Sequence, residues 1–442
     1  MPDNLGDLRA DGAVAVVRRA PFSDNPEVGA RGRRTQQRIL DAALRAFAET
    51  GYHGASIDRI TTLARCSRVS FYQYFASKED VFRLLAGQVA RQVSASTEAL
   101  DPLTADLRGW AALRSWVARY AEIHARYEPI FHALETDDAL AALARRTGEE
   151  TIARIHARLG PVGTVNAAAL PPRQVGPVIT LLLECLNHTL DVSGILRAGA
   201  PGAYPCDRVE IALTDVLHRT FFGMEPGVNV HPPGGPPPPA LAPSPGMLAL
   251  LGRNGASSSE GGGNRALDAL LASAGAVFAD RGFHNTRVDD LVAAAGVSHG
   301  AFYRYFKNKD ELARILTVRA VQTVGEAVLE IPEVSTLEGP SGRSRLRRWL
   351  RRYHAAHATE AAMLRVWVDA AVQDRAIRAE SAPPLDWGRR RLSRYLQPRG
   401  FGDADLEAVV MVALLGVFGA RTRPPAEFDA AAHIIERGLL GR

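Results

Sequence analysis

The sequence predicts a helical protein built from two tandem copies of one unit. Three observations support this prediction: a long internal repeat, apolar residues at helical spacing in both copies, and a Pro- and Gly-rich stretch between the copies. Shifting the chain by 231 positions places ten residues between Gly51 and Lys78 on identical residues between Gly282 and Lys309, without a gap. A self-match at so long a period indicates a duplicated domain rather than an array of short repeats.

Length and composition agree with two soluble domains. The chain has 442 residues, more than a single core usually supports, and 46% of them are hydrophobic. A formal net charge of +5 and a pI of about 9.3 permit a polyanionic partner without proving one. The three cysteines lack the spacing of a metal site, so we expect free thiols and neither metal nor cofactor. An uncharged apolar run of the ~18 residues that a membrane span needs is missing, which favours a cytoplasmic protein with no membrane partner.

The first copy contains the pattern of a helix-turn-helix. Apolar residues between Thr35 and Glu49 follow helical spacing, and Gly51 ends the run. Ser56 can cap a following short helix, and Ser67 can cap another one after a tight turn. Such a unit suits DNA, because the N-terminal side chains of its second helix can reach base edges. An ordinary helical hairpin with half-buried tyrosines is the alternative that composition leaves open.

The remaining segments also have helical patterns, and composition separates the two copies. Pro232 to Pro239 is a stiff polyproline run, and Ser257 to Gly263 is flexible. At ~3.1 Å per residue in polyproline II form, this stretch can span a whole domain. The apolar helices that we expect outside the repeated motif cover residues 107–160, 174–196, 207–222, 403–420 and 427–440.

Both copies of the motif resemble a known family. The stretch from Gly51 to Lys78 is similar to the DNA-binding domain of TetR-type transcriptional repressors, and Ala-Gly-Val-Ser-His-Gly-Ala-Phe-Tyr-Arg-Tyr-Phe-Lys-Asn-Lys at 295–309 is closer still. The resemblance implies an all-α fold with two tandem TetR-like units, each a three-helix DNA-binding domain followed by a helical domain for ligand binding and dimerisation. Together with composition, it divides the chain into a disordered segment 1–30, a first helix-turn-helix domain 31–82, a first regulatory domain 83–225, a linker 226–263, a second helix-turn-helix domain 264–313 and a second regulatory domain 314–442.

The resemblance also implies which residues contact a double-stranded DNA operator. Phe71, Phe75 and their counterparts should hold each recognition helix against the core of its domain. The positions that meet base edges in the family are Arg68, Val69 and Gln73 in the first copy and His299, Gly300 and Arg304 in the second. The positions assigned to the DNA backbone are Ser56, Ser70, Tyr72, Tyr74 and Lys78 in the first copy and Tyr303, Tyr305 and Lys309 in the second. Thr286 and Ala301 complete the predicted DNA-binding set. Arg33 and Arg34 should extend the contact as an arm along the backbone or into a minor groove.

The two copies depart from the family pattern at different places. Gly296 keeps the glycine of the turn, whereas Arg65 replaces it, at a cost of ~1 kcal/mol if the backbone is left-handed there. Val69 likewise stands where the second copy has Gly300. The second copy lacks the serine cap, and residues 286–289 offer a capping box one residue earlier instead. We expect both copies to bind DNA, the first one weakly or with an altered preference.

Ligand and assembly are less well defined by the sequence. A hydrophobic small-molecule inducer is suggested by the aromatic residues Trp110, Trp116, Tyr120, Phe131 and Trp367, although core packing predicts the same residues. Because one chain carries both sets of C-terminal apolar helices, we expect an intramolecular pseudo-dimer in which 174–222 packs against 403–440. A homodimer of tandem chains is the alternative. The sequence shows no pattern of an enzyme, so the rival function is a protein-interaction adaptor of the same fold that has lost DNA binding in one or both units.

Overall fold

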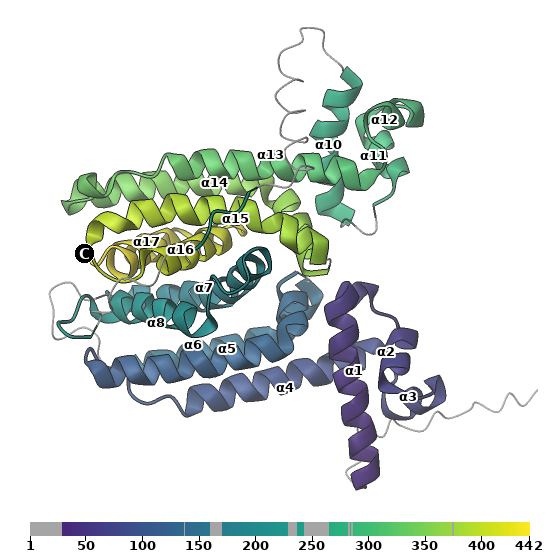
Figure 1. Ribbon diagram of the computed structural model, residues 1–442, viewed down its shortest axis with the longest axis horizontal. Helices are drawn as coiled ribbons and strands as arrows, with labels where there is room; N and C mark the ends of the chain where they lie inside the picture. The colour runs from purple at the N-terminus through teal and green to yellow at the C-terminus, as the bar shows by residue number, and fades with distance from the viewer. Residues whose placement is uncertain are drawn as a thin grey trace, which may run out of the picture.

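The computed structural model describes residues 29–136, 138–159, 170–228, 237–242, 265–281, 283, 286–373 and 375–442, and over these ranges the protein is helical and contains no strand. The disorder expected for residues 1–30 falls almost wholly outside the described residues, as does most of the linker 226–263. Figure 1 shows two similar halves that pack side by side.

The first half begins with a small helical domain, α1 to α3, which we call head 1. Its helices pack around Phe47, Phe71 and Phe75, which are all buried. A φ of 69° at Gly51 breaks α1 where the apolar pattern ends, so the last residues of α1 form a separate turn. The helices of this half are α1 (Ala30–Gly54), α2 (Ile57–Ala64), α3 (Arg68–Tyr74), α4 (Lys78–Glu98), α5 (Leu107–Thr136), α6 (Asp138–Leu159), α7 (Pro172–Gly199) and α8 (Cys206–Phe222).

The second half repeats this order and begins with head 2, formed by α10 to α12. The core of head 2 contains Phe278, Phe302 and Phe306. The helices of this half are α10 (Arg265–Arg281), α11 (Val288–Ala295), α12 (His299–Tyr305), α13 (Lys309–Leu329), η2 (Val334–Thr336), α14 (Gly339–Gln373), α15 (Arg375–Leu396), η3 (Gln397–Arg399), α16 (Ala404–Gly419), α17 (Pro425–His433) and the π-helical turn η4 (Ile434–Leu439).

The two halves meet along a junction in which α7 and α8 contact α15, α16, α17 and η4 (Figure 1). Apolar side chains from both halves, including Leu186, Leu213 and Val410, belong to one continuous core. Within the described ranges, α7 is the one helix long and apolar enough to span a membrane, but 56% of its apolar window is buried inside the protein. The junction therefore accounts for the apolarity of α7 without a membrane.

A buried ionic network crosses the junction. Arg219 of α8 pairs with Glu407 of α16 at 2.6 Å, and neither side chain is exposed. Arg219 Nε also donates to the carbonyl oxygen of Gly438 at 2.8 Å, and Arg399 pairs with the same Glu407 at 2.5 Å. Because removing one member would leave an uncompensated buried charge, this network requires the two surfaces to meet in one register.

The described part of the linker, residues 237–242, is attached to the junction. The Leu241 N–H donates to Asp386 Oδ2 at 2.9 Å, and the Leu241 side chain packs against an apolar cluster drawn from both halves. Gly199 leaves the space for this contact, because a Cβ there would lie 2.8 Å from Leu241 Cδ1 and 2.6 Å from Ala382 Cβ. This part of the linker is thus a packed segment rather than a free spacer.

Candidate nucleic-acid interface and effector cavity

The recognition helices α3 and α12 display the same division into a buried and an exposed face. Phe71 and Phe302 are fully buried, whereas Val69, Tyr72 and Tyr303 are 72%, 47% and 58% exposed. All of the predicted base-contact residues lie on the exposed side, namely Arg68, Val69, Gln73, His299, Gly300 and Arg304. The half-buried members of the predicted DNA-binding set on these two helices are Ser70, Tyr74, Ala301 and Tyr305. An exposed stripe of this kind can enter a groove while the opposite face holds the helix in place.

Serine caps fix the start of both recognition helices. Ser67 Oγ accepts from the N–H of Ser70 at 3.0 Å, and Ser298 Oγ accepts from the N–H of Ala301 at 3.2 Å. Ser56 caps α2 in the same way by accepting from the Arg59 N–H at 3.1 Å. The exposed hydroxyl of Ser56 thus has a structural role beside its predicted phosphate contact.

The turn between the two helices is left-handed in both heads. In head 2, Gly296 has φ 65° and ψ 32°. In head 1, Arg65 occupies the same position with φ 51° and ψ 50°, and it is the one non-glycine residue with positive φ in the described part of the chain. An L-residue other than glycine is strained there because its Cβ approaches the following carbonyl oxygen.

The two predicted phosphate-contact lysines bind protein backbone instead. Lys78 Nζ donates to the carbonyl oxygens of Tyr52 at 2.6 Å and Ala55 at 2.9 Å, and lies 4.7 Å from the centre of the Tyr52 ring. Lys309 Nζ donates to the carbonyl oxygens of Phe283 at 2.8 Å and Thr286 at 2.9 Å, and lies 4.6 Å from the Phe283 ring. Burial lowers the pKa of Lys78. Each ammonium group therefore stabilises, through these hydrogen bonds and the ring contact, the loop that precedes the second helix of its head.

Thr286 belongs to the predicted DNA-binding set, but it lies inside head 2. It is only 1% exposed, which keeps it from DNA in this structure. The predicted capping box is also displaced, because α11 is capped at Arg287, whose N–H donates to Asp290 Oδ2 at 2.8 Å. Asp290 at the third helical position thus satisfies the Arg287 N–H, whereas a capping serine would accept from the N–H of Asp290 itself.

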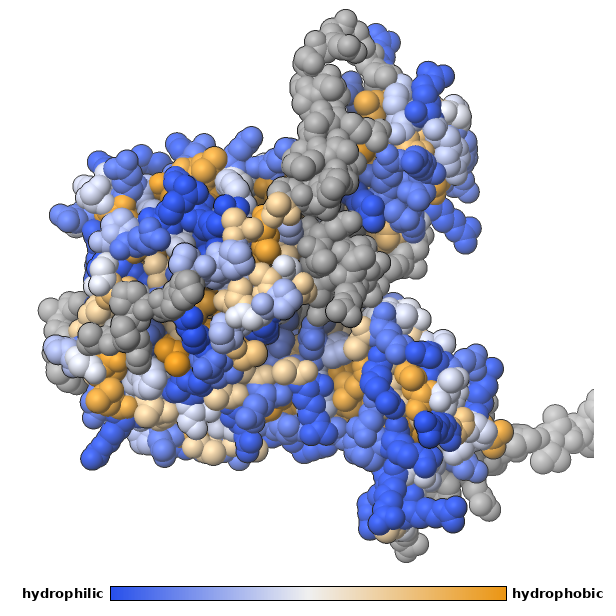
Figure 2. All heavy atoms as spheres, in the orientation of Figure 1, coloured by the Kyte–Doolittle hydropathy of each residue, from blue (hydrophilic) through white to orange (hydrophobic). Residues whose placement is uncertain are grey.

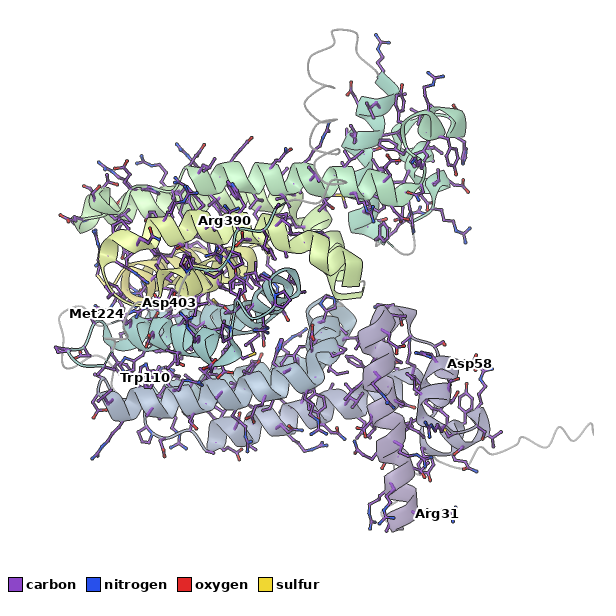
Figure 3. The ribbon with its side chains drawn as sticks, viewed as in Figure 1. Arg31, Asp58, Trp110, Met224, Arg390 and Asp403 are labelled. Carbon is purple, nitrogen blue, oxygen red and sulfur yellow. The ribbon has the colours of Figure 1, made fainter. Side chains whose placement is uncertain are left out.

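The first residue of each recognition helix is paired with an aspartate of the preceding helix. Arg68 Nε lies 3.0 Å from Asp58 Oδ1, and His299 Nε2 lies 2.5 Å from Asp289 Oδ1. Figure 3 labels Asp58 on the outer side of head 1. All four side chains are more than half exposed, so DNA can replace these pairs at little cost.

The N-terminal part of α1 carries arginines and no acid in its first turn. Arg31 stands at the free end of this helix in Figure 3, and Arg33 and Arg34 are exposed. Figure 2 shows hydrophilic residues along this part of α1. Cations at a helix N-terminus oppose the helix dipole, so this end favours an anionic partner. The corresponding α10 has Asp268 in its first turn and lacks this feature.

A cavity of about 900 Å³ runs through the junction, with walls formed by α4 to α7 of the first half and α13 to α16 of the second. Tyr120, Phe131 and Trp367 of the predicted ligand set line it. Trp110 and Trp116 do not, because their indole N–H groups are turned to Asp215 at 2.7 Å and Thr97 at 3.3 Å. These two members of the predicted set therefore lie outside the cavity, because aromatic content alone does not separate core from cavity.

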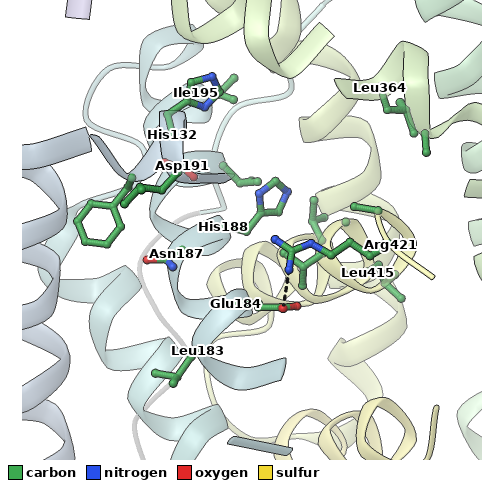
Figure 4. Close-up of a pocket in the computed structure, with 18 of the residues that line it drawn as sticks. His132, Leu183, Glu184, Asn187, His188, Asp191, Ile195, Leu364, Leu415 and Arg421 are labelled. Atoms are coloured by element: carbon green, nitrogen blue, oxygen red, sulfur yellow. Dashed lines mark hydrogen bonds and ion pairs between the residues drawn. The ribbon is translucent and has the colours of Figure 1, made fainter. Parts of the chain in front are cut away.

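The sequence analysis missed most of the polar lining of the cavity. Glu184, Asn187, His188 and Asp191 follow one another on α7 and face the cavity in Figure 4. Their spacing of three and four residues places them on one face of an otherwise apolar helix, which was the available signal. Across the described ranges, no group of three or more His, Cys, Asp or Glu side chains is arranged to hold a metal ion.

Comparison with known proteins agrees with this geometry. The family model "Bacterial regulatory proteins, tetR family" matches residues 39–85 and 270–315, one segment in each half, which covers most of the head and the start of α4 or α13. The HTH-type transcriptional repressor AcnR of Corynebacterium diphtheriae is 29% identical over 136 residues, which cover 28% of this chain and 70% of AcnR. The HTH-type transcriptional repressor NicS of Pseudomonas putida is 29% identical over 116 residues, which cover 26% of this chain and 54% of NicS. A solved tetR-family regulator from Streptomyces coelicolor aligns with 42% of this chain and 82% of its own, with 19% identity and a TM-score of 0.32.

Two repeated three-helix heads, each with a capped recognition helix, define a helix-turn-helix DNA-binding protein. The same family model matches both heads, and the curated relatives are regulators of the same kind. Both heads therefore carry a DNA-binding domain of the TetR type.

Proposed function

We propose that the chain is a transcriptional repressor that binds one operator as an intramolecular pseudo-dimer and is released by a small molecule in the cavity. The observation that carries the proposal is the junction, where α7 and α8 of one half pack against α16, α17 and η4 of the other half of the same chain. Repressor is the function named for AcnR and NicS. Their alignments span 70% and 54% of those proteins, so this part of the function remains a proposal here.

The placement of the heads supports binding to one face of DNA. Figure 1 shows head 1 and head 2 on the same side of the helical body, one from each half. Two recognition helices in successive major grooves need a separation of about 34–36 Å, which a dimeric regulator obtains from two chains. Here, one chain supplies both helices.

The buried network at the junction supports contact between unlike halves. Arg219 and Glu407 come from different halves and form their ion pair without exposure to solvent. A junction formed by two first halves from separate chains would bury Arg219 without Glu407. Such a junction is disfavoured, because an uncompensated buried charge costs several kcal/mol.

Differences between the recognition helices support an operator with unlike half-sites. Arg68 and Gln73 in α3 correspond to His299 and Arg304 in α12. A bidentate arginine prefers guanine and a glutamine prefers adenine, so the two heads should select different bases. The arginine-bearing end of α1 should add salt-dependent phosphate contacts at the half-site of head 1 only.

A route from the cavity to DNA is provided by α4 and α13. Each helix begins beside its head, at Lys78 or Lys309, and then lines the cavity with residues such as Val89 and Val324. A ligand that favours a different position of either helix would change the separation of the heads. The coupling would be reciprocal, so bound DNA would weaken the ligand by the same factor.

Light scattering combined with selection of a DNA site from a random pool tests this proposal. We expect one chain per DNA, unlike half-sites, and binding that weakens steeply with salt. Two chains on a perfect palindrome would refute the pseudo-dimer. Failure to select any DNA, with the fold intact, would favour the protein-interaction adaptor.

A further inference from the structure

An aspartate of the preceding helix lies beside the first side chain of both recognition helices. Asp58 is in the first turn of α2, and its Oδ1 lies 3.0 Å from Arg68 Nε. Asp289 is in the first turn of α11, and its Oδ1 lies 2.5 Å from His299 Nε2. The two pairs occupy equivalent positions of the repeat, 231 residues apart. The reading side chain thus differs between the heads, whereas the aspartate beside it is the same.

These carboxylates have no second partner that would explain their place. Among the described residues, no other hydrogen bond or ion pair is made by the side chain of Asp58 or Asp289. Each acid lies where the helix dipole favours a negative charge, which is the structural alternative. An exposed ion pair adds little to stability, so the value of these pairs lies elsewhere than in the fold.

In head 1, the pair leaves the terminal groups of Arg68 free for a base. Asp58 lies at Nε, and the two Nη groups of Arg68 have no hydrogen-bond partner among the described residues. Guanine accepts a bidentate contact from two such groups at O6 and N7. Arg68 can make this contact without leaving Asp58. A guanidinium group held at one edge also has less freedom to lose when it binds.

In head 2, the pair determines which kind of group His299 offers to a base. His299 Nε2 is within hydrogen-bonding distance of Asp289 Oδ1. Because an ionised carboxylate can only accept, Nε2 carries the proton in this pair. The other nitrogen of the neutral imidazole, Nδ1, is then an acceptor. An acceptor in the major groove favours an amino group, which is N6 of adenine or N4 of cytosine.

We propose that Asp58 and Asp289 are positioning residues that determine base preference through the side chains they hold. Head 1 then prefers guanine at the base pair that Arg68 meets. Head 2 prefers adenine or cytosine at the base pair that His299 meets. The inference rests on the proposed DNA-binding function and adds two specificity-determining residues that lie outside the recognition helices.

A double-mutant cycle on the full chain tests head 1. Affinities are measured for the selected operator and for its variants at the base pair where Arg68→Ala has its effect. We expect Asp58→Ala to lower the preference for guanine at this base pair by about threefold or more, and to leave the preferences at other base pairs unchanged. In the Arg68→Ala background, Asp58→Ala should have no further effect on the preference, because the side chain that it positions is gone.

A purely structural role of Asp58 predicts a different result. If the carboxylate only stabilised α2 or repelled phosphates, its removal would change the affinity for all operator variants by the same factor. That result, or an equal loss of preference in both backgrounds, would overturn the inference for head 1. Glu49→Ala is the matched control, because Glu49 forms an exposed ion pair with Arg59 of α2 at 2.7 Å. It should leave every base preference unchanged.

The tautomer of His299 tests head 2 in the absence of DNA. Nitrogen–proton correlation spectra of the neutral imidazole should place the proton on Nε2 in the parent chain. Asp289→Asn should increase the share of the form protonated at Nδ1, because an amide can donate to Nε2 as well as accept from it. An unchanged share would overturn the inference for head 2. On DNA, the same variant should reduce the preference for adenine or cytosine by about threefold or more.

The DNA measurements separate this inference from the function on which it rests. A chain that selects no DNA rejects the proposed function and the inference together. A chain that binds its selected operator, and keeps its base preferences without Asp58 and Asp289, rejects the inference alone.

Discussion

Replacing Arg65 by glycine should stabilise head 1. The residue holds φ 51° and ψ 50° at the turn between α2 and α3, where head 2 has Gly296. This conformation costs a non-glycine residue about 1–2 kcal/mol. Glycine offsets up to about 1 kcal/mol of this gain, because it increases the conformational entropy of the unfolded chain. Because the Arg65 side chain is exposed, its removal sacrifices little packing, and the net gain should be about 0.5–1 kcal/mol.

Hydrogen exchange of the backbone amides in α2 and α3 measures this gain directly. The head opens locally, so a gain of this size should slow exchange roughly two- to fivefold there and leave head 2 unchanged. Global thermal unfolding is less suitable, because the body and head 2 unfold in the same experiment.

Gly296→Ala is the matched control in the opposite direction. A Cβ at Gly296 meets no atom within 4 Å, so any effect comes from the backbone conformation and not from a clash. Exchange in α11 and α12 should accelerate. Faster or unchanged exchange in Arg65→Gly, or no effect of Gly296→Ala, would show that the turn is not strained in the way the geometry indicates.

Lys309→Met should destabilise head 2 by about 1–3 kcal/mol, because it removes the ammonium group that binds the loop carbonyls, and hydrogen exchange would measure this loss. If stability were unchanged and DNA binding instead became less dependent on salt, the lysine would contact phosphate and the prediction would be contradicted. Arg304→Ala should change the preference at one base pair by about 1–3 kcal/mol in a panel of single-base operator variants, whereas equal loss on all variants would argue for a phosphate contact. Glu407→Gln should lower the free energy of unfolding in urea by about 3–5 kcal/mol, because Arg219 stays buried without its counter-ion. A loss below about 1 kcal/mol would mean that the network is not rigid. Burial lowers the pKa of His188 to about 4, so the unfolded chain binds the proton first and stability should fall as the pH drops from about 6.5 to 4. His188→Leu should reduce that slope between pH 6.5 and 5 without abolishing it, because burial also lowers the pKa of His124, His218, His357 and His433 to about 4. An unchanged slope would exclude His188 as a contributor.

The sequence was sufficient for features that depend on neighbouring residues. Ser67 and Ser298 could be identified as caps because a cap needs only a serine before a short apolar helix. The left-handed turn at Gly296 follows from a glycine at the end of such a helix. The alignment of the two copies then identifies Arg65 as the residue in the same left-handed position of head 1. The three cysteines are free, as their spacing predicted.

Features that depend on distant residues could not be derived in this way. Lys78 meets the carbonyl oxygen of Tyr52, 26 positions earlier, and no local pattern shows whether an ammonium group turns to the protein or to DNA. The indole N–H of Trp110 likewise donates a hydrogen bond to Asp215, which lies 105 positions later in the chain. The cavity requires two halves in contact, so its lining could not be separated from ordinary core before the junction was known.

The attachment of residues 237–242 to α15 bears on how the regulator would behave at low abundance. A regulator assembled from separate chains falls apart on dilution, and the amount of assembled species then declines with the square of the chain concentration. In a pseudo-dimer fastened through Leu241 and Asp386, the partner surface is always supplied by the same molecule, at a high effective concentration. Each newly made chain would be competent to occupy an operator without waiting for a second one. Occupancy would then follow copy number in simple proportion, and a cell could hold such a gene silent with very few molecules.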